Sequence, residues 1–552
     1  MIKKIIALIC AVIMLCACLT SCKKDKETTD ISSDEIFTSD LENYTVVYSS
    51  DCGKDVKTKI DEMVEKIKSL YGVKLNTVID INQSTADKEI LVGETNRPEN
   101  KEFLVNMRIK DYGYAKVESK IVIAGTSEEY TLKSLEKFVE TVLGQKNEKI
   151  VFSETDIVRA EYDIDDMSIN GESVKGWSVV YPADYSNSEK NFAERIQQKL
   201  SEISGYYVRL GTDEENISEK AIVVRTADKS GISVSGNVIT LSGDGKYTLA
   251  QLCSTVTGVL TDSKAENGVI DVKITEDTPL AEFLTVMSFN LRFDLTEYAG
   301  ISRADAVVKQ IRDLSPSVFG VQEDTKQWCD ILDSKLTEYT AVHTSKPIGN
   351  NTSSQEYLTI YYRTDSFTLV ESGTKYLSDT PNLPTKFSES TIQRAMNYAV
   401  LEPTDGGEKI CFINTHLEHT DSESTRVTRE KARQKQTAVL IEQTKKICDK
   451  YEGIASVTVG DFNCTVRESV HTSMRENGYD DCRLTAFEVK SQGTWNNAYY
   501  GDPLNKNSDI LDYCYVSKND FMICSYTVSV DKYNGMYTSD HFPIVINLLL
   551  NE

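Results

Sequence analysis

The second half of the chain alternates short apolar runs with polar loops. From about residue 281 these runs include "FLTVMSFNLRF", "SVFGVQED", "EYLTIYYR", "KICFINTHLEH", "IASVTVGDFNC" and "FPIVINLLL". Residues 303–314 and 425–449 instead carry apolar positions at helical spacing. Strands mixed with crossover helices over a segment of this length predict one large α/β domain, a layered sandwich, at residues 281–552.

Two stretches of the first half repeat one pattern. "KIVIAGTSEEYTLKSLEKFVETVL" (120–143) and "NVITLSGDGKYTLAQLCSTVTGVL" (237–260) both run from a strand through a polar turn and Tyr-Thr-Leu into an amphipathic helix. Each is preceded by a further strand and helix, which begin at "NYTVVYSS" and "WSVVYPAD". The pattern predicts two small repeated α/β modules at 43–160 and 175–280. The first loosely resembles the small α/β domains that precede catalytic domains in some bacterial glycoside hydrolases.

The N-terminus reads as a targeting segment. In "MIKKIIALICAVIMLCACLTSCKK" two lysines precede an apolar run that is too short for a stable transmembrane helix, which is typical of a secretory signal. Leu-Thr-Ser-Cys resembles the bacterial lipoprotein box, which implies a signal peptide at 1–21 and a lipid on Cys22. An ordinary signal peptide with an incidental cysteine is the alternative. Residues 22–42 have little apolar content and are expected to form a flexible tether.

Composition narrows the classes of function. The formal charge of −24 repels polyphosphates at long range, which disfavours avid non-specific nucleic-acid binding but leaves room for a nuclease with a basic groove. Nine of the 13 cysteines lie beyond the signal and lack paired spacing, so we expect neither a zinc ribbon nor a disulfide framework. All five histidines lie beyond residue 340. Candidate chemistry is therefore confined to the last domain.

Polar side chains recur where the predicted strands of this domain end, and strand ends at one edge of a sheet can converge on a ligand. Asp461 and Asn463 are two residues apart, so on a strand they would share one face. Alone, "GDFN" can equally be an Asx turn. Together the set holds carboxylates, amides and imidazoles, with no cysteine or serine that looks like a nucleophile: Asn290, Glu323, His416, Asp461, Asn463, Asp512, Asp540 and His541.

The motifs "SFNLR", "QE", "QRAMNYAVL", "NTHLEH", "GDFN", "LDYCYV" and "SDHFPI" occur in this order between residues 284 and 549. In this order they resemble the endonuclease/exonuclease/phosphatase superfamily, which has the DNase I-like fold. The resemblance implies a four-layered α/β sandwich with its site at one edge of two packed sheets. It also implies a metal-dependent hydrolase that acts on phosphate ester bonds.

The resemblance implies a metal site of oxygen ligands, which suit Mg²⁺ or Mn²⁺. Glu323 would hold the ion, Asn290 would support it, and Asp540 would be a second ligand. Some DNA-repair members carry an acidic residue two positions after the first asparagine, where this chain has Arg292. That departure points toward the one-carboxylate pattern of many phosphatases and phosphodiesterases.

The remaining residues would act on water and phosphate. Asp461 would orient or deprotonate the attacking water. His541 would contact the phosphate or take the water's proton, with Asp512 fixing its tautomer. Further contacts to phosphoryl oxygens would come from Asn463, His416 and Arg394. A zinc pair of His416 and His419 is disfavoured, because strand positions three apart face opposite sides.

These inferences predict a lipid-anchored, extracytoplasmic phosphoesterase on the bacterial cell surface, attached to the membrane through its N-terminal lipid. The substrate would be a phosphate monoester or diester in a lipid head group, a sugar phosphate or a nucleic acid. The two modules would serve as a spacer or dock a glycan or another surface ligand. A secreted nuclease of the same fold and a non-catalytic surface binding protein are the alternatives.

Overall fold

The computed structural model describes residues 35–50, 52–82, 84–214, 219–295, 297–298, 301–344, 355–496 and 509–551. The predicted signal peptide, Cys22 and the tether up to residue 34 lie outside these ranges. None of the helices within them combines the length and the hydrophobicity that a bilayer span requires. The chain divides into two compact units, one with residues up to 178, 197–209 and 264–272, the other with 179–196, 210–263 and 273–552. Apart from the end of the tether, the predicted domain boundaries stay predictions.

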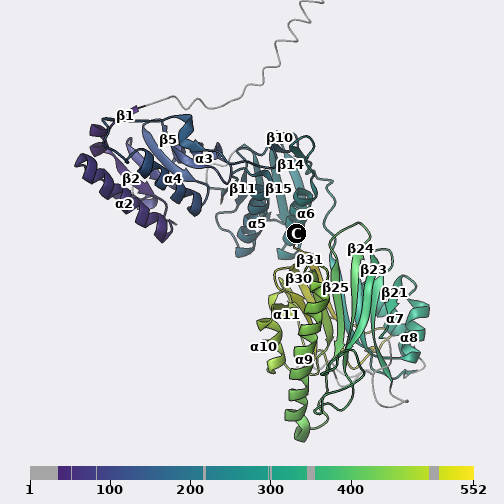
Figure 1. Ribbon diagram of the computed structural model, residues 1–552. Helices are drawn as coiled ribbons and strands as arrows, with labels where there is room; N and C mark the ends of the chain where they lie inside the picture. The colour runs from purple at the N-terminus through teal and green to yellow at the C-terminus, as the bar shows by residue number, and fades with distance from the viewer. Residues whose placement is uncertain are drawn as a thin grey trace, which may run out of the picture. The chain divides into compact units, whose positions relative to one another are not determined.

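The first unit contains a mostly parallel sheet with helices on both faces (Figure 1). Its strand order is β3 (Asn76–Ile79), β2 (Thr45–Tyr48), β4 (Glu89–Val92), β6 (Lys120–Gly125), β5 (Tyr112–Val117) and β8 (Ile157–Val158). One face is covered by α2 (Lys54–Tyr71) and α4 (Glu128–Thr141), and the other by α3 (Pro98–Val105). Strands β4 and β6 are buried along their whole length, as expected for strands covered on both faces.

The end of the predicted tether is wrong. Residues 35–43 form β1 (Glu35–Phe37) and the 3₁₀ helix η1 (Thr38–Asn43), and β1 pairs with β7 (Lys149–Val151). The segment is polar overall, but Ile36 and Leu41 are buried in the core of the first module. Two buried apolar side chains and the pairing of three residues of β1 with β7 are enough to order this segment. The average composition of the segment does not reveal such single positions.

A second sheet has the order β12 (Arg209–Thr212), β11 (Ser178–Tyr181), β13 (Ala221–Thr226), β15 (Val238–Gly243) and β14 (Gly231–Ser235). This order matches β3-β2-β4-β6-β5 of the first sheet strand for strand. The helices α5 (Asn187–Ser204) and α6 (Lys246–Asp262) follow β11 and β15, as α2 and α4 follow β2 and β6. Residues 227–230 join β13 directly to β14, at the position where the first sheet has α3.

The rest of the second unit is built on two sheets. The β17 sheet has the order β21 (Tyr339–Val342), β22 (Glu356–Arg363), β20 (Val318–Thr325), β17 (Leu284–Asn290), β31 (Ile544–Leu550), β30 (Phe521–Val528) and β28 (Glu488–Lys490). The β26 sheet has the order β23 (Phe367–Tyr376), β24 (Ala395–Pro403), β25 (Ile410–His416), β26 (Ala455–Asp461), β29 (Asp512–Ser517) and β27 (Tyr479–Asp481).

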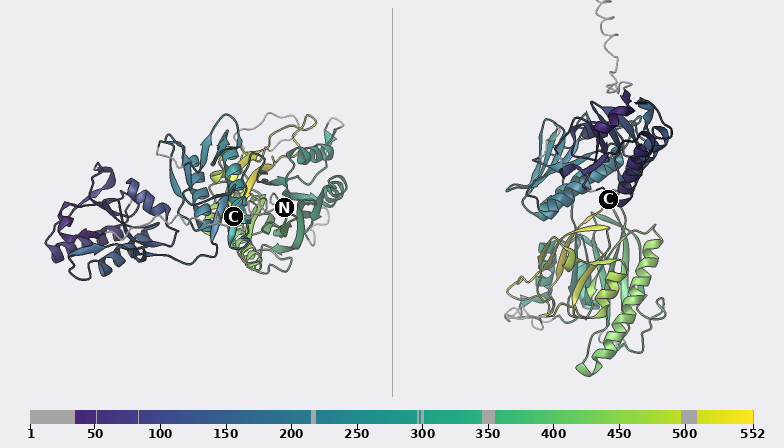
Figure 2. Two further views of the ribbon diagram at one scale, coloured as in Figure 1. Left: turned by 90° about the horizontal axis from the view of Figure 1, so that it is seen from above. Right: turned by 90° about the vertical axis from the view of Figure 1, so that its left-hand side faces the viewer.

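Three apolar cores make these sheets the inner pair of four layers. Val286, Phe412 and Val459 belong to the core between the two sheets. Against the outer face of the β17 sheet lie α7 (Arg303–Leu314) and α8 (Lys326–Lys335), which contribute Ile311 and Trp328 to a second core. The β26 sheet is covered by α9 (Arg426–Asp449) and α10 (Ser469–Glu476) through the third core. The long helix α9 stands out along this face in Figures 1 and 2.

The predicted four-layered α/β sandwich is therefore confirmed. The helical patterns at 303–314 and 425–449 correspond to α7 and α9. Along β17 the side chains alternate between layers, with Met287 and Phe289 facing the helices and Val286 facing the other sheet. Strands β23 and β30 are not among the apolar runs singled out above. In β23 most side chains are only half-buried, because it is an edge strand.

Candidate active site

Two parallel strands of the β17 sheet deliver the first polar pair. Strands β17 and β20 run side by side with Asn290 opposite Gln322, so both end at the same edge and Glu323 lies one residue further on. The guanidinium of Arg303, which is 1 % exposed, holds the segments beyond these strand ends. It donates to the carbonyl oxygens of Leu291 at 2.6 Å and Thr538 at 2.8 Å. The loop before β31 is thereby tied to the end of β17.

Three strands of the β26 sheet deliver the second set. In the pairing of β25, β26 and β29, His416 lies opposite Asp461, and Asp461 lies opposite Asp512. The three residues are therefore direct neighbours across the sheet, and all three are buried. Local sequence accounts for each strand, but the shared edge follows from the register of the three strands.

The amide of Asn290 joins the two sheets. Its Nδ2 donates to Glu323 Oε1 and to Asp461 Oδ2, both at 3.0 Å. Its Oδ1 accepts the backbone N–H of Arg292 at 2.9 Å, which sets the orientation of the amide. A carboxylate from each sheet therefore shares one side-chain amide, and the edge of the sandwich becomes one continuous polar site.

His541 sits in this site between two carboxylates. Its Nδ1 is 2.8 Å from Asp512 Oδ2, and its Nε2 is 3.9 Å from Asp461 Oδ2. Its backbone N–H donates to Ser539 Oγ, which in turn donates to the carbonyl oxygen of Asn290. Burial alone would lower the pKa of His541. The charges of Asp512 and the other nearby carboxylates outweigh burial and raise that pKa to about 10, so the imidazole is protonated at neutral pH.

Asp461 is the residue on which the site converges. In addition to its contacts with Asn290 and His541, Asp461 contacts His416, whose Nε2 lies 3.5 Å from Asp461 Oδ2. The other carboxylate oxygen, Oδ1, accepts the backbone N–H of Asn463 at 2.8 Å. Burial and the charge of Asp512 raise the pKa of Asp461, although His541 opposes them. Burial, Arg394 and His541 lower the pKa of His416, so this imidazole is neutral. The site thus pairs a charged and a neutral imidazole with one central carboxyl group.

Glu356 is a carboxylate of this region that the sequence analysis missed. It begins β22, and burial together with the charge of Glu323 raises its pKa to about 7, while Arg394 acts in the opposite direction. A glutamate that opens an apolar strand reads as a solvated residue in the sequence. Nothing in "EYLTIYYR" distinguishes it, since Glu323 lies in another strand and Arg394 just before β24.

Asp540 and Arg394 each contact a partner outside the group that surrounds Asp461. Arg292 reaches Asp540, with Nη1 3.2 Å from Oδ2. Arg394 is 4 % exposed, and its Nη2 is 3.2 Å from Nδ1 of His419. His419 also pairs with Asp421 through Nε2 at 2.7 Å. His416 and His419 therefore have separate partners.

The "GDFN" segment differs from the strand geometry that the sequence analysis assumed. Strand β26 ends at Asp461, and Asn463 follows in a left-handed conformation with φ 49°. The backbone N–H of Asn463 bonds to Asp461 Oδ1 in an Asx-type turn, while the Asn463 side-chain amide donates to the carbonyl oxygen of Leu417 at 3.1 Å, so strand alternation does not place the two side chains. Gly460 is required by packing against β25, since a Cβ there would lie 2.1 Å from the carbonyl oxygen of Thr415.

The donor set of the site suits a hard divalent cation. Carboxylate oxygens of Asp461 and Asp512 lie within 4.8 Å of each other, and Glu323 shares the Asn290 amide with Asp461. Among the described residues, Oδ1 of Asp512 has no hydrogen-bond partner although it is buried. Several carboxylates held close together with an unpaired buried oxygen fit the Mg²⁺ or Mn²⁺ expected from the sequence.

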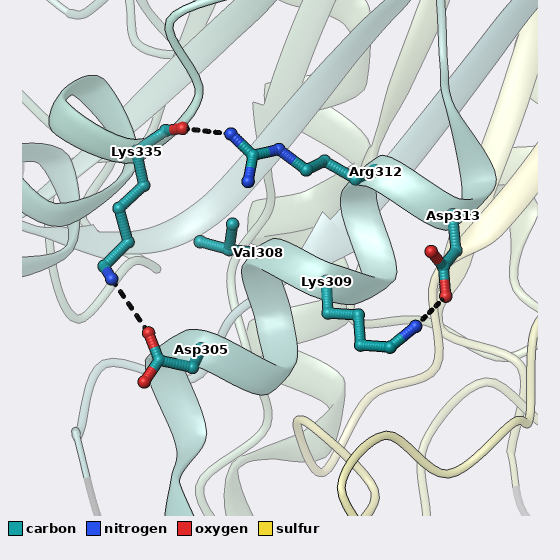
Figure 3. A pocket seen from close by; sticks show the side chains of 6 residues that line it. All are labelled: Asp305, Val308, Lys309, Arg312, Asp313 and Lys335. Carbon is teal, nitrogen blue, oxygen red and sulfur yellow. Dashed lines mark hydrogen bonds and ion pairs between the residues drawn. The ribbon is translucent and has the colours of Figure 1, made fainter.

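A hollow of about 310 Å³ on the outer side of α7 and α8 is a different kind of feature (Figure 3). Four of its charged side chains pair with one another, with Lys335 Nζ 2.8 Å from Asp305 and Lys309 Nζ 2.5 Å from Asp313, while Arg312 pairs with Glu338 outside the hollow. These exposed ion pairs are worth at most about 1 kcal/mol each. None of the predicted site residues lines this hollow, and we assign no ligand to it.

One family model matches the part of the chain in which the residues of this site lie. The sequence model of the Endonuclease/Exonuclease/phosphatase family matches residues 287–541. No curated protein matches the chain. A solved endonuclease/exonuclease/phosphatase family protein from Bacteroides thetaiotaomicron is similar at 23% identity and a TM-score of 0.42, over 49% of this chain and 99% of that one.

Two further solved structures are similar over the same part. The mannosyl-6-phosphatase of Bacteroides thetaiotaomicron is 24% identical with a TM-score of 0.41, over 48% of this chain and 99% of that one. The human Nocturnin catalytic domain with bound sulfate is 18% identical with a TM-score of 0.38, over 49% of this chain and 95% of that one. The residues that match the family model begin within β17 and end before β31, so they contain the polar edge and every other strand of the two sheets. Residues 287–541 are a domain of the endonuclease/exonuclease/phosphatase family, with the DNase I-like fold.

Proposed function

We propose that this domain hydrolyses a phosphate mono- or diester by in-line attack of water, with the aid of Mg²⁺ or Mn²⁺. The observation that carries the proposal is the convergence on Asp461 of groups from both sheets, with Asn290, His416 and His541 all within 3.9 Å of its Oδ2. Phosphate ester hydrolysis needs a positioned water, a proton acceptor and donors for the phosphoryl oxygens. One buried carboxyl group surrounded by amide and imidazole donors supplies these together.

Asp461 is the proton acceptor in this proposal. Its raised pKa makes it a stronger base than an exposed aspartate, and a general base works best when its pKa lies near the working pH. The N–H of Asn463 holds Oδ1 at 2.8 Å, and Asn290 holds Oδ2 at 3.0 Å. The carboxylate is therefore oriented before substrate binds.

His541 contacts the phosphate and does not take the water's proton. Its raised pKa keeps it charged, and Asp512 accepts the hydrogen on Nδ1, so Nε2–H is left to donate to a phosphoryl oxygen. His416 is neutral and provides a second imidazole without adding charge. Asn463 and Arg394 complete the phosphate contacts. This arrangement supports the first of the two roles that the sequence left open for His541.

Glu323 and Asn290 would hold the metal ion, which when bound neutralises charge on the phosphoryl group. The ion pair of Arg292 with Asp540 competes with a role for Asp540 as a second ligand. Arg292 therefore supports the one-carboxylate pattern suggested by the sequence. We further propose that the protein is a lipoprotein anchored by Cys22 on the extracytoplasmic side of the membrane, where its substrate is a lipid head group, a sugar phosphate or a nucleic acid.

The test is hydrolysis by the full chain with Mg²⁺, Mn²⁺ or a chelator. p-Nitrophenyl phosphate and bis(p-nitrophenyl) phosphate compare monoester with diester, while mannose 6-phosphate, sphingomyelin, a phosphoinositide and plasmid DNA compare substrate classes. We expect metal-dependent release of product that a chelator abolishes. The double variant Asp461→Ala with His541→Ala should be folded by circular dichroism and inactive. Unchanged hydrolysis in that double variant would overturn the proposal.

A further inference from the structure

A second cluster of metal-ligating side chains lies on the other side of β20. Asp324 is the second-last residue of β20, Cys329 lies in the first turn of α8, and His343 directly follows β21. One ligand atom from each lies within 4.8 Å of the others. Asp324 Oδ2 accepts from Cys329 Sγ at 3.3 Å, whereas the preceding residue, Glu323, contacts Asn290 in the active site. Neighbouring carboxylates therefore serve two separate clusters.

Strand β20 has a β-bulge that contains Glu323 and ends at Asp324. Val321 pairs with Thr359 and Asp324 pairs with Tyr357, so two residues of β20 lie opposite Leu358 alone. Glu323 itself has φ 57°, a left-handed conformation that is uncommon for a residue other than glycine. The contacts that fix Asp324 therefore also determine how the bulge presents Glu323.

The imidazole of His343 is arranged as metal-bound histidines are. Its Nε2 is 3.0 Å from Asp333 Oδ2, and the other oxygen of Asp333 accepts the hydroxyl of Tyr361 at 3.0 Å. A carboxylate that accepts one ring N–H leaves the opposite nitrogen free as a ligand, which is the usual outer shell of a histidine–metal site. That opposite nitrogen, Nδ1, faces the cluster, 2.9 Å from Thr359 Oγ1.

The two oxygens of Asp324 differ in their hydrogen bonding. Thr359 Oγ1 donates its one hydrogen to Asp324 Oδ2 in a short hydrogen bond, so Nδ1 of His343 does not receive it. Asp324 is 0 % exposed, and within the described residues its Oδ1 has no hydrogen-bond partner. A buried polar atom without a partner is costly unless a ligand satisfies it. His343, with a side chain 31 % exposed, leaves a route for an ion to enter.

We propose that Asp324, Cys329 and His343 bind one zinc ion. A thiolate, an imidazole and a carboxylate form a ligand set that favours Zn²⁺, whereas Mg²⁺ prefers oxygen ligands alone. Thr359 or a water would complete four-coordination. The ion would hold the β20 bulge and so position Glu323. The domain would then carry two sites of different metal preference, joined by consecutive residues of one strand.

The test uses cobalt, because Co²⁺ bound to a thiolate gives a sulfur-to-metal charge-transfer absorption that an oxygen-ligated ion does not. The metal-free full chain is titrated with Co²⁺ and then with Zn²⁺. We expect one thiolate-bound Co²⁺ per chain, displaced by one equivalent of Zn²⁺. Because the readout is spectroscopic, it is independent of the proposed phosphoesterase activity and of metal bound at Asp461.

Four variants make the test specific. Cys329→Ser should lose the charge-transfer band, and the matched control Cys448→Ser, which alters a cysteine outside the cluster, should keep it. Removal of the outer carboxylate in Asp333→Asn should weaken Co²⁺ binding by about 10- to 100-fold. If Cys329→Ser fails to fold, His343→Ala carries the test, with at least a tenfold loss of affinity expected. A folded wild-type chain without the band, or a band unchanged in Cys329→Ser or His343→Ala, would overturn the zinc site.

Discussion

The first module and the catalytic edge both bury charged side chains, but they balance them differently. In the first module Glu89, which is 0 % exposed, lies 3.2 Å from Arg97 and 3.0 Å from Lys120, and Lys120 also reaches Glu99 at 2.9 Å. Burial alone would raise the pKa of Glu89, but hydrogen bonds from the two cations lower it. The network is closed in charge, because two carboxylates face two cations, although Oε2 of Glu99 makes no hydrogen bond among the described residues.

The catalytic edge is open by the same measure. Asp461 and Asp512 share the charge of His541, while Asp540 pairs with Arg292, and the pKa of Asp461 is raised instead of lowered. An excess of buried negative charge destabilises the fold unless a cation or a proton joins it. The comparison teaches that a balanced network of buried charge serves stability, whereas an unbalanced one marks a place where a metal ion or substrate belongs.

The largest expected effect is on catalysis at the open cluster. Asp461→Asn keeps the shape of the side chain but removes the proton acceptor, so kcat should fall by about 10³- to 10⁴-fold. The melting temperature of the metal-free protein should stay the same or rise, because one of the mutually repelling carboxylates is gone. Steady-state kinetics and calorimetry measure the two quantities. Asp365→Asn, which alters an exposed carboxylate, is the control. A fall in stability with full activity would contradict our view of the edge.

The closed cluster should respond in the opposite way. Glu89→Gln removes the carboxylate that pairs with Arg97 and leaves Lys120 with Glu99 alone, which should lower the free energy of unfolding of the first module by about 3–5 kcal/mol. Hydrogen exchange of β4 and β6 amides measures that loss locally, and kcat should not change. Glu65→Gln, which alters an exposed ion pair with Lys68, should change the free energy of opening measured by hydrogen exchange by less than about 0.5 kcal/mol. Equal exchange in both variants would remove the distinction between closed and open networks.

His471 offers a buried ionisable group without an ionic partner. Its ring contacts Thr465 O at 3.0 Å and the Tyr515 hydroxyl, and burial lowers its pKa to about 4. The unfolded chain takes up this proton near pH 6.5 and the folded chain only near pH 4, so the unfolded state binds more protons between them. Stability is therefore lost as pH falls through this window, by up to about 3 kcal/mol. Urea unfolding against pH should show a smaller loss in His471→Gln; an identical loss would exclude His471 as its source.

The smallest expected effect concerns the balance of charge at the rim. Arg292→Ala frees Asp540 from its partner and adds negative charge beside the site, so KM for an anionic substrate should rise about 5- to 10-fold, equivalent to roughly 1 kcal/mol. The value of kcat should change less than KM. Arg312→Ala removes a guanidinium from the hollow of Figure 3 and is the matched control. A rise in KM that is equal in both variants would mean that net charge matters and position does not.

Much of the fold could be predicted because it depends on local patterns. Apolar periodicity in 303–314 and 425–449 corresponds to α7 and α9, since a helix must present one apolar face to a core. The ordered segment at 35–43 was missed because its two buried residues, Ile36 and Leu41, are few among polar neighbours. Strand β23 was missed because an edge strand needs less apolar content than a central one.

The candidate site divides in the same way. Residue types at strand ends were readable along the chain, and so was their common chemistry. Their partners were not: Asn290 contacts Asp461 across 171 positions, and Arg292 contacts Asp540 across 248. Glu356 was missed, and the cluster of Asp324, Cys329 and His343 was not singled out. The environment of each of these side chains is formed by residues from other elements, which the sequence does not show.

Composition and periodicity are properties of short stretches, so the amino-acid order sufficed for the layers, the main helices and the kind of chemistry at the sheet edge. Packing of the two sheets settled which carboxylates are left without a cation and which imidazole is charged. Those outcomes depend on burial and on charges a few ångströms away, and a pKa or a metal preference arises only once distant segments share the same dry space.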